Sequence, residues 1–269
     1  MSSDETSKAA ASQPDIDLEA ASLQMGGPRI KFNTHRVPFT GGIDEREATA
    51  LADALAEMER FGAAPVLPDG KVGGNGAVRC SDGRMLVSKS GKFAGETIGP
   101  RDFALLHSFD RARWSAEFSS PSEAINPSSD SPLLWAALCE GERHGFARSR
   151  LPRVALHGHA LATPEDAHAL GYPISHEQTL FSTREDVDAL TALFARHPFP
   201  TTRVWIRRGH GFFILADSID DALAVFRNEI VPHMKRANSN STAAADRPAA
   251  GSKSDAVLLG SSQKLRSRL

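Results

Sequence analysis

Apolar residues recur at helical spacing in four stretches of the chain. These predicted helices cover residues 44–60, 132–142, 184–195 and 220–234. Ser129 or Asp130 precedes the second helix, and Ser182 or Thr183 caps the third. Short polar side chains in such places accept hydrogen bonds from the free N–H groups of the first turn. Amphipathic helices of this kind cover one face of a core.

Short apolar runs bounded by turn residues predict seven strands. They cover residues 76–80, 85–88, 103–106, 114–118, 154–159, 203–207 and 212–216. The turn Ser81-Asp82-Gly83-Arg84 joins the first two into a hairpin. Strands grouped mostly in hairpins, with helices between some of them, indicate an α/β fold in which helices cover both faces of a mixed sheet.

Both ends of the chain differ in composition from the part between them. Residues 1–28 are rich in Ser, Ala, Asp and Gln, and residues 237–269 are rich in Asn, Ser, Ala and Gly. Such segments bury too little apolar area to offset the entropy that ordering them costs. The sequence therefore predicts two disordered tails around a single domain at 29–236, without an internal repeat.

Composition narrows the range of partners. The chain has 269 residues and a formal net charge of -2, with 41% hydrophobic and 24% charged residues. This balance is not basic enough to indicate nucleic-acid binding, and no apolar run is long enough to span a membrane. The N-terminus lacks a secretory signal, and the only cysteines, Cys80 and Cys139, fit a reducing compartment such as the cytoplasm.

The chain ends in Ser267-Arg268-Leu269. A C-terminal Ser-Lys-Leu is read by the peroxisomal import receptor, and Ser-Arg-Leu keeps its small, basic and leucine positions. A disordered tail would also present the free carboxylate that a receptor must reach. We therefore expect import into a peroxisome-type organelle such as a glycosome, whereas a chance tripeptide would leave the protein in the cytoplasm.

Three histidines follow two of the predicted strands. His157 and His159 end the run that begins at Val154, and His210 comes shortly after the strand at 203–207. Side chains alternate between faces along a strand, so His157 and His159 point the same way. Three imidazoles leave an open position on a zinc ion, an arrangement typical of catalytic zinc. A His-x-His pair alone is as often an ordinary surface or core feature as a metal site. Other motifs in the chain are therefore needed to support metal binding.

Small and polar residues gather in three loops next to predicted strands and helices. The loops are Gly73-Gly74-Asn75-Gly76, Ser88-Lys89-Ser90-Gly91-Lys92 and Pro127-Ser128-Ser129-Asp130-Ser131. Hydroxyls, an amide and backbone N–H groups at loops and at a helix N-terminus suit a phosphate group. Each loop alone is more often a turn or a helix cap, so only their combination supports an anion site.

The order of these motifs along the chain resembles that of the class II aldolase/adducin family. The motifs are the three loops, the His-x-His pair and Arg208-Gly209-His210-Gly211. With the segment 213–222, the resemblance spans about residues 43–227. It implies a three-layer α/β/α sandwich with a central mixed, largely antiparallel sheet. Family members include zinc-dependent sugar-phosphate aldolases, pentose-phosphate 4-epimerases, a dehydratase and non-catalytic adducin. The enzymes are commonly homotetramers.

The resemblance implies a role for each of these positions. His157, His159 and His210 match the ligands of the Zn²⁺ ion. Asp130 matches a glutamate that transfers a proton and can bind the metal in the resting enzyme. The positions that match contacts to the substrate phosphate are Asn75, Ser90, Gly91, Ser128 and Ser129.

Two departures from the family pattern bear on this assignment. Asp130 is one methylene shorter than glutamate, so its carboxylate is expected about 1.5 Å farther back, and a misplacement of about 1 Å can lower a rate by about 100-fold. The stretch at 160–208, which shapes the mouth of the pocket, is short for the family. Glu177 is either a substitute acid or, as is more common in a loop, a solvated residue, and Tyr172 is the only tyrosine that the chain offers as a proton donor.

The chain admits two hypotheses. In the first, it is a zinc-dependent aldolase that cleaves or forms a C–C bond in a small phosphorylated ketose through a metal-stabilised enediolate, with a 4-epimerase or a dehydratase as variants. In the second, it is an adducin-like scaffold without turnover. The three histidines favour the enzyme, whereas the aspartate at position 130 favours the scaffold.

Overall fold

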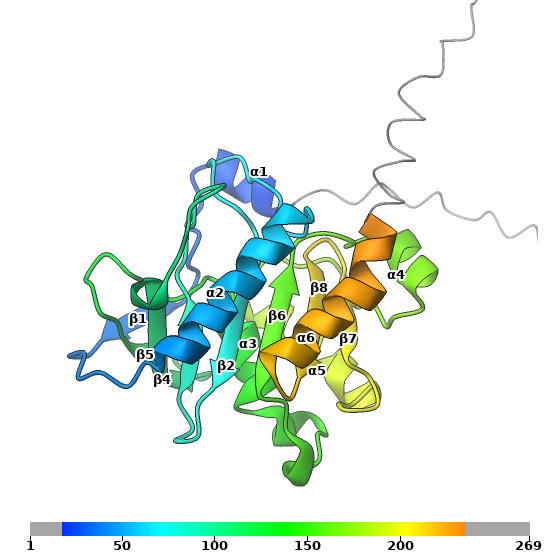
Figure 1. Ribbon diagram of the computed structural model, residues 1–269. Coiled ribbons are helices and arrows are strands. Elements are labelled where there is room, and N and C mark those ends of the chain that lie inside the picture. Colours follow the sequence, from blue (N-terminus) through cyan, green and yellow to red (C-terminus); the bar gives the residue numbers. More distant parts are fainter. Residues whose placement is uncertain (1–17, 235–269) are drawn as a thin grey trace, which may run out of the picture.

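The computed structural model describes residues 18–234, so most of both predicted tails lies outside the described residues. Eight strands form one sheet in the order β1-β5-β4-β3-β2-β6-β8-β7 (Figure 1). The strands are β1 (Asn33–Arg36), β2 (Asn75–Arg79), β3 (Met85–Ser88), β4 (Phe103–Asp110), β5 (Ser115–Ser119), β6 (Val154–Gly158), β7 (Val204–Arg207) and β8 (Gly211–Ala216). Only the edge pair β1 and β5 is parallel among these strands. The predicted mixed, largely antiparallel sheet is confirmed.

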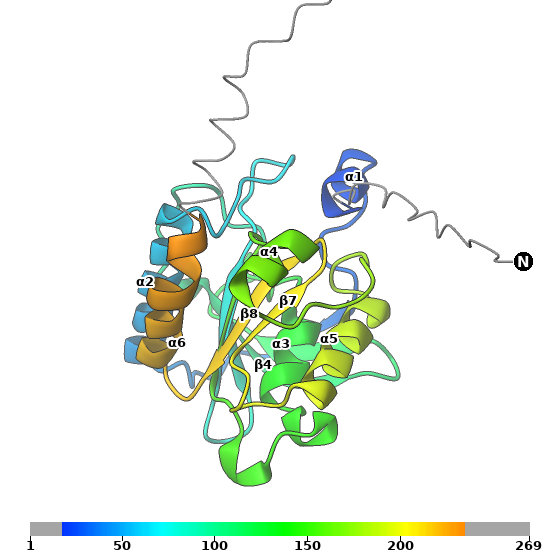
Figure 2. The ribbon, with the colours of Figure 1, turned by 90° about the vertical axis from the view of Figure 1, so that its right-hand side faces the viewer.

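Helices cover both faces of the sheet. They are α1 (Leu18–Gln24), α2 (Glu45–Arg60), α3 (Ser131–Leu138), α4 (Pro164–Leu170), α5 (Arg184–Arg196) and α6 (Ile219–Val225), which continues into a π-helical turn at Phe226–Ile230. Short 3₁₀ turns lie at Pro100–Asp102, Gly141–His144 and Arg148–Arg150. Helices α2 and α6 lie on one face and α3 and α5 on the other (Figure 2), which gives the three predicted layers. Within the described residues, no helix is both long and apolar enough to cross a membrane.

Local sequence explains where the main helices begin. Asp44 caps α2 by accepting a hydrogen bond from the backbone N–H of Glu47, and Thr183 caps α5 in the same way. The predicted helix at 132–142 is shorter in the structure, because α3 ends at Leu138 and a 3₁₀ turn follows.

The structure contains three elements that the apolar pattern did not predict. Helix α1 lies inside the segment expected to be disordered. Strand β1 reads Asn-Thr-His-Arg and three of its four residues are exposed, so it carries no apolar signal. Helix α4 buries only Ala167, and a capping box formed by Thr163 and Asp166 stabilises its start instead.

Strand β6 separates two hydrophobic layers. Val154 and Leu156 face the layer formed with α2 and α6, whereas Ala155 faces the layer formed with α3 and α5. His157 continues this second side and stacks on Phe213 of β8, with ring centroids 4.0 Å apart. The pairing register sets His157 opposite both Asn75 of β2 and Phe213 of β8. The end of β6 therefore meets two neighbouring strands where the polar motifs lie.

Candidate metal centre and anion cavity

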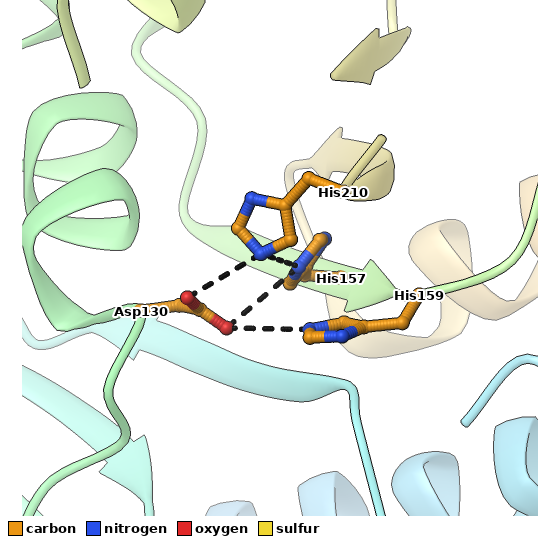
Figure 3. Close-up of side chains that lie close together, drawn as sticks. All are labelled: Asp130, His157, His159 and His210. Carbon is orange, nitrogen blue, oxygen red and sulfur yellow. Dashed lines mark hydrogen bonds and ion pairs between the residues drawn. The ribbon is translucent and has the colours of Figure 1, made fainter. Parts of the chain in front are cut away.

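Four buried or nearly buried side chains converge at the end of β6: Asp130, His157, His159 and His210 (Figure 3). One ligand atom from each lies within 4.8 Å of the others. His157 is on β6, His159 follows it directly, His210 lies in the turn between β7 and β8, and Asp130 is the residue before α3. The fold therefore brings together the three histidines and the aspartate singled out in the sequence. We call these four residues the metal cluster.

Spacing within the metal cluster suits a small divalent ion. The Nε2 atoms of His159 and His157 lie 3.5 and 3.7 Å from Oδ2 of Asp130, and Nε2 of His210 lies 3.5 Å from Oδ1. The Nε2 atoms of His157 and His210 are 3.0 Å apart. Ligands of a tetrahedral zinc, with bonds of about 2.0–2.1 Å, are separated by roughly 3.3–3.4 Å. Three imidazole nitrogens and a carboxylate oxygen at these separations fit such an ion.

The outer nitrogens of two histidines already face acceptors. Nδ1 of His157 lies 2.8 Å from the backbone oxygen of Phe212, and Nδ1 of His210 lies 3.2 Å from Oδ2 of Asp186. The first contact is a hydrogen bond and the second an ion pair, and each places an acceptor beside Nδ1, which leaves Nε2 directed at the cluster. Two lone pairs facing each other at 3.0 Å repel unless a proton or a metal ion lies between them. A proton on one Nε2 would make this contact a hydrogen bond, and a metal ion would take the place of that proton.

Burial and mutual charge set the ionisation of the cluster. Burial lowers the pKa of His157 well below its ordinary value and also lowers the pKa of His159. Burial acts in the same direction on His210, but the carboxylates of Asp186 and Asp130 outweigh it and raise its pKa to about 9. Burial alone would raise the pKa of Asp130, yet the facing histidines, His210 foremost, hold it well below its usual range. Without a metal, the cluster therefore keeps a proton on His210 beside a carboxylate anion.

Asp130 reaches the imidazoles although it is shorter than glutamate. It occupies the N-cap position of α3, but its side chain makes no capping hydrogen bond. Its carboxylate instead accepts hydrogen bonds from Nδ2 of Asn75 at 2.5 Å and from Oγ of Ser182 at 2.9 Å. The carboxylate is therefore held within 3.7 Å of a ring nitrogen of each histidine.

Phe181 covers the metal cluster from the loop before α5. Its ring stacks on His210, with centroids 3.6 Å apart, and meets His159 edge-on at 5.1 Å. Gly73 also lies against His159, because a Cβ at position 73 would stand 2.6 Å from two atoms of the imidazole. The side chain of His159 is 8% exposed, against 0% for His157 and His210, so the cluster is approached from the side of His159.

A small cavity opens beside Asp130 and His159, and we call it the anion cavity. Its other polar or glycine lining residues are Arg29, Gly73, Gly74, Asn75, Lys89, Ser90, Gly91, Lys92, Ser128 and Ser129. All five residues predicted to contact a phosphate thus line one cavity, although their roles stay predictions. The contact that the structure gives the Asn75 amide is with Asp130.

The basic residues of the anion cavity already have acidic partners. The ion pairs are Arg29–Asp69, Lys89–Glu96, Lys89–Asp102 and Lys92–Glu59. An anionic ligand would therefore share these cations with carboxylates, and would rely more on hydroxyl and backbone donors.

Neither alternative acid lies in the metal cluster. The hydroxyl of Tyr172 donates to Glu229, and burial raises its pKa. The metal-ligating group found in the described part of the chain does not include Glu177, whose backbone oxygen accepts a hydrogen bond from Ser175.

Sequence reasoning missed several residues that support the site. Phe181, Ser182 and Asp186 lie in the stretch between the histidine motifs, where the sequence indicated a helix with Ser182 as a candidate cap but no contact with the metal cluster. Asp186 falls in the first turn of α5, where an acid is already explained by the helix dipole. Arg29 lies before the part of the chain that resembles the aldolases, so no motif pointed to it.

Comparison with known proteins shows which solved structures share this fold. A scan against protein-family models and a search of curated proteins found no match. A sugar-phosphate aldolase from Thermotoga maritima matches in structure with a TM-score of 0.51 and 13% identity, covering 76% of this chain and 98% of that chain. An aldolase II superfamily protein from Pseudomonas syringae matches with a TM-score of 0.50 and 15% identity, covering 76% of this chain and 79% of that chain. At these identities the likeness concerns the fold. The chain thus has the class II aldolase fold that the order of its motifs predicted.

Proposed function

We propose that the protein is a metal-dependent aldolase that cleaves or forms a C–C bond in a small phosphorylated ketose, with Zn²⁺ as its ion. The observation that carries the proposal is the convergence of Asp130, His157, His159 and His210, whose ligand atoms lie within 4.8 Å of one another. The anion cavity beside it supplies a place for a phosphate. The Thermotoga maritima protein of the same fold is described as a sugar-phosphate aldolase.

His157, His159 and His210 would hold the metal, with Asp130 as the fourth group. A bound divalent ion supplies Lewis acidity for the negative charge that C–C cleavage develops on substrate oxygens. The protein surrounds the cluster with low-dielectric groups, Phe181 and Phe213 among them, and these strengthen electrostatic interactions. Substrate would enter beside His159, the most exposed of the three histidines.

The anion cavity would hold the end of the substrate that does not react. Ser128 and Ser129 offer hydroxyls just before α3, and Ser90 and Gly91 line the same cavity. Binding energy from a remote phosphate fixes the reacting carbons beside the metal cluster. Arg29 adds a positive charge to this cavity.

Asp130 would move the proton. Its low pKa keeps it ionised at neutral pH, so it can accept a proton but is a weak base. Asn75 and Ser182 fix its direction, and both contacts stabilise the anion.

One observation favours the adducin-like scaffold as a second candidate. The three histidines and Asp130 complete a set of four protein groups, and Phe181 covers His210. Structural zinc sites are closed in this manner, whereas catalytic sites keep a position open. In a scaffold, the metal would stabilise the fold without turnover.

A substrate screen separates these candidates. Zinc-loaded protein is incubated with ketose 1-phosphates and pentulose 5-phosphates, and cleavage and isomerisation are monitored separately. We expect cleavage that requires the metal and falls at least ~1,000-fold in His157→Ala, with an unchanged circular dichroism spectrum. Isomerisation or dehydration without cleavage would identify an epimerase or a dehydratase instead. Tight zinc binding without turnover on any sugar phosphate would support the scaffold.

Two proposals concern the whole chain rather than the site. We propose that Ser267-Arg268-Leu269, which lies outside the described residues, directs import into a peroxisome-type organelle. Imaging of a tagged protein with and without these three residues tests this, and retention of import without them would reject it. We also propose a homotetramer, which analytical ultracentrifugation tests directly.

A further inference from the structure

A second buried charge lies directly behind the metal cluster. Asp186, in the first turn of α5, is fully buried, and its Oδ2 lies 3.2 Å from Nδ1 of His210. A buried carboxylate is costly unless it is paired and hydrogen-bonded. The partners of Asp186 therefore indicate why it is there.

Both oxygens of Asp186 are used. Oδ1 accepts from Nε and Nη2 of Arg207 at 2.9 and 2.7 Å and from Oγ1 of Thr179 at 3.1 Å. Oδ2 accepts from the backbone N–H of Ser182 at 3.0 Å and faces His210. The carboxylate is held rigidly, with one oxygen for the arginine and the other for the imidazole.

Helix capping explains only the bond from the backbone N–H of Ser182 to Asp186. Thr183 is the N-cap of α5, and its hydroxyl already accepts a hydrogen bond from the backbone N–H of Asp186. The carboxylate of Asp186 is turned away from solvent, although an acid in a first helical turn would ordinarily be exposed. Its orientation is accounted for by His210 and Arg207.

Arg207 holds Oδ1 of Asp186, the oxygen that does not face His210. It is the last residue of β7, it is fully buried, and it also donates to the hydroxyls of Ser175 and Thr179. These bonds tie the loop at 175–182 to the sheet, and this loop carries both Phe181 and Ser182 onto the metal cluster. Arg207 and Asp186 thus connect the strand, the loop and the histidine.

We propose that Asp186 is a positioning residue for the metal centre: it holds the His210 ring with Nδ1–H toward itself and Nε2 toward the ion, while Arg207 fixes the carboxylate. The proposal rests on the metal-binding part of the proposed function and does not require turnover. Partners of this kind, behind a metal-ligating histidine, typically change metal affinity by about 10–100-fold when they are removed.

Zinc affinity of the full-length chain, measured by competition with a chelator, tests the proposal. We expect Asp186→Asn to bind zinc about 10–100-fold more weakly than the wild type. Asp188→Asn is the matched control, because Asp188 is on the same helix with a side chain that is 70% exposed. Its zinc affinity should equal that of the wild type. An Asp186→Asn variant that binds zinc as tightly as the wild type would overturn the proposal, as would an equal loss in both variants.

Removal of one buried charge leaves the other unpaired, so Asp186→Asn alone risks unfolding. The double variant Asp186→Asn/Arg207→Gln removes both charges, and its zinc affinity should fall as in the single variant. Wild-type affinity in the folded double variant would contradict the role of Asp186.

Imidazole NMR of the zinc-loaded protein gives a readout that a purely structural role would not move. In Asp186→Asn, we expect the Nδ1–H signal of His210 to shift and to exchange faster with solvent. The Nδ1–H signal of His157, which faces the backbone oxygen of Phe212, should stay unchanged. Equal changes in both signals, or none in His210, would overturn the proposal. Zinc binding that depends on Asp186 in a protein without aldolase activity would keep this inference and reject only the proposed reaction.

Discussion

The metal cluster and the anion cavity share Asp130 and His159, but their charges are arranged in opposite ways. In the cluster, both ring nitrogens of His159 lack a hydrogen bond within the described part of the chain, and two Nε2 atoms face each other. In the cavity, Arg29, Lys89 and Lys92 are all neutralised by nearby carboxylates. The cluster therefore leaves ring nitrogens without hydrogen-bond partners among the residues described and could hold a metal ion, whereas the cations of the cavity are already paired. The proposed ion would bind a site that the fold assembles, and anion affinity would depend on ion pairs that substitutions can adjust.

The prediction with the largest expected effect displaces His159 through a substitution at Gly73, a residue that is not itself part of the metal cluster. Gly73→Ala would place a methyl group 2.6 Å from the His159 ring, so the imidazole has to shift. We expect zinc affinity, measured by chelator competition, to fall about 10–100-fold, as when a supporting contact of a metal ligand is lost. Gly99→Ala is the control, because a Cβ there meets no atom within 4 Å. Equal affinities in the two variants would show that the cluster tolerates displacement of His159.

A smaller effect is expected in the anion cavity. Arg29→Ala removes one cation and leaves Asp69 unpaired, so phosphate would meet a more negative surface. We expect the dissociation constant for inorganic phosphate, measured by calorimetry on metal-free protein, to rise about 10-fold, which corresponds to about 1.4 kcal/mol for one charge-assisted contact. Arg113→Ala serves as the control, because its side chain is 84% exposed. A drop in phosphate affinity of the same size in the control would mean that only net charge matters.

The smallest expected effect concerns His144, a half-buried histidine outside the metal cluster, and it tests how burial alone changes a histidine pKa. Burial, together with Arg111 and Arg143, lowers the pKa of His144 to about 4. Because the folded pKa lies below the unfolded value of 6.5, the unfolded chain takes up a proton first as pH falls. Stability from this group is therefore present above pH 6.5 and is lost between pH 6.5 and 4.

In His144→Gln, the free energy of unfolding from urea titrations should decline less between pH 7 and 4.5, by roughly 1 kcal/mol after allowance for solvent screening. The variant His35→Gln changes an exposed histidine on β1 and should decline as the wild type does. An unchanged decline in His144→Gln would contradict the lowered pKa.

Much of the fold could be predicted because its signals are local. The hairpin of β2 and β3 has apolar runs and a turn between them, and α2 has a cap and a regular apolar face. Strand β1 escaped prediction because its pairing with β5 holds it in place, and helix α4 escaped because it buries a single alanine and so shows no apolar period. Pairing between strands that are distant in sequence cannot be predicted from a short stretch of residues.

The same distinction applies to the site. His157 and His159 were predictable because alternation along a strand puts them on one side. Asp186 was not, since its neighbours Arg207 and His210 are distant in sequence and an acid at that position needs no explanation. Ser182 adopts a φ of 62°, a backbone conformation that could not be predicted from a serine at this position. This turn directs its hydroxyl onto Asp130.

The register between β6 and β8 has a consequence for how the protein assembles. His157 is opposite Phe213, and its Nδ1 faces the backbone oxygen of Phe212. A slip of one residue would turn the imidazole to the layer of α2 and α6, away from His210 and Asp130. The ion proposed above would then lack a complete set of ligands, so its uptake would report that these two strands have paired in this register.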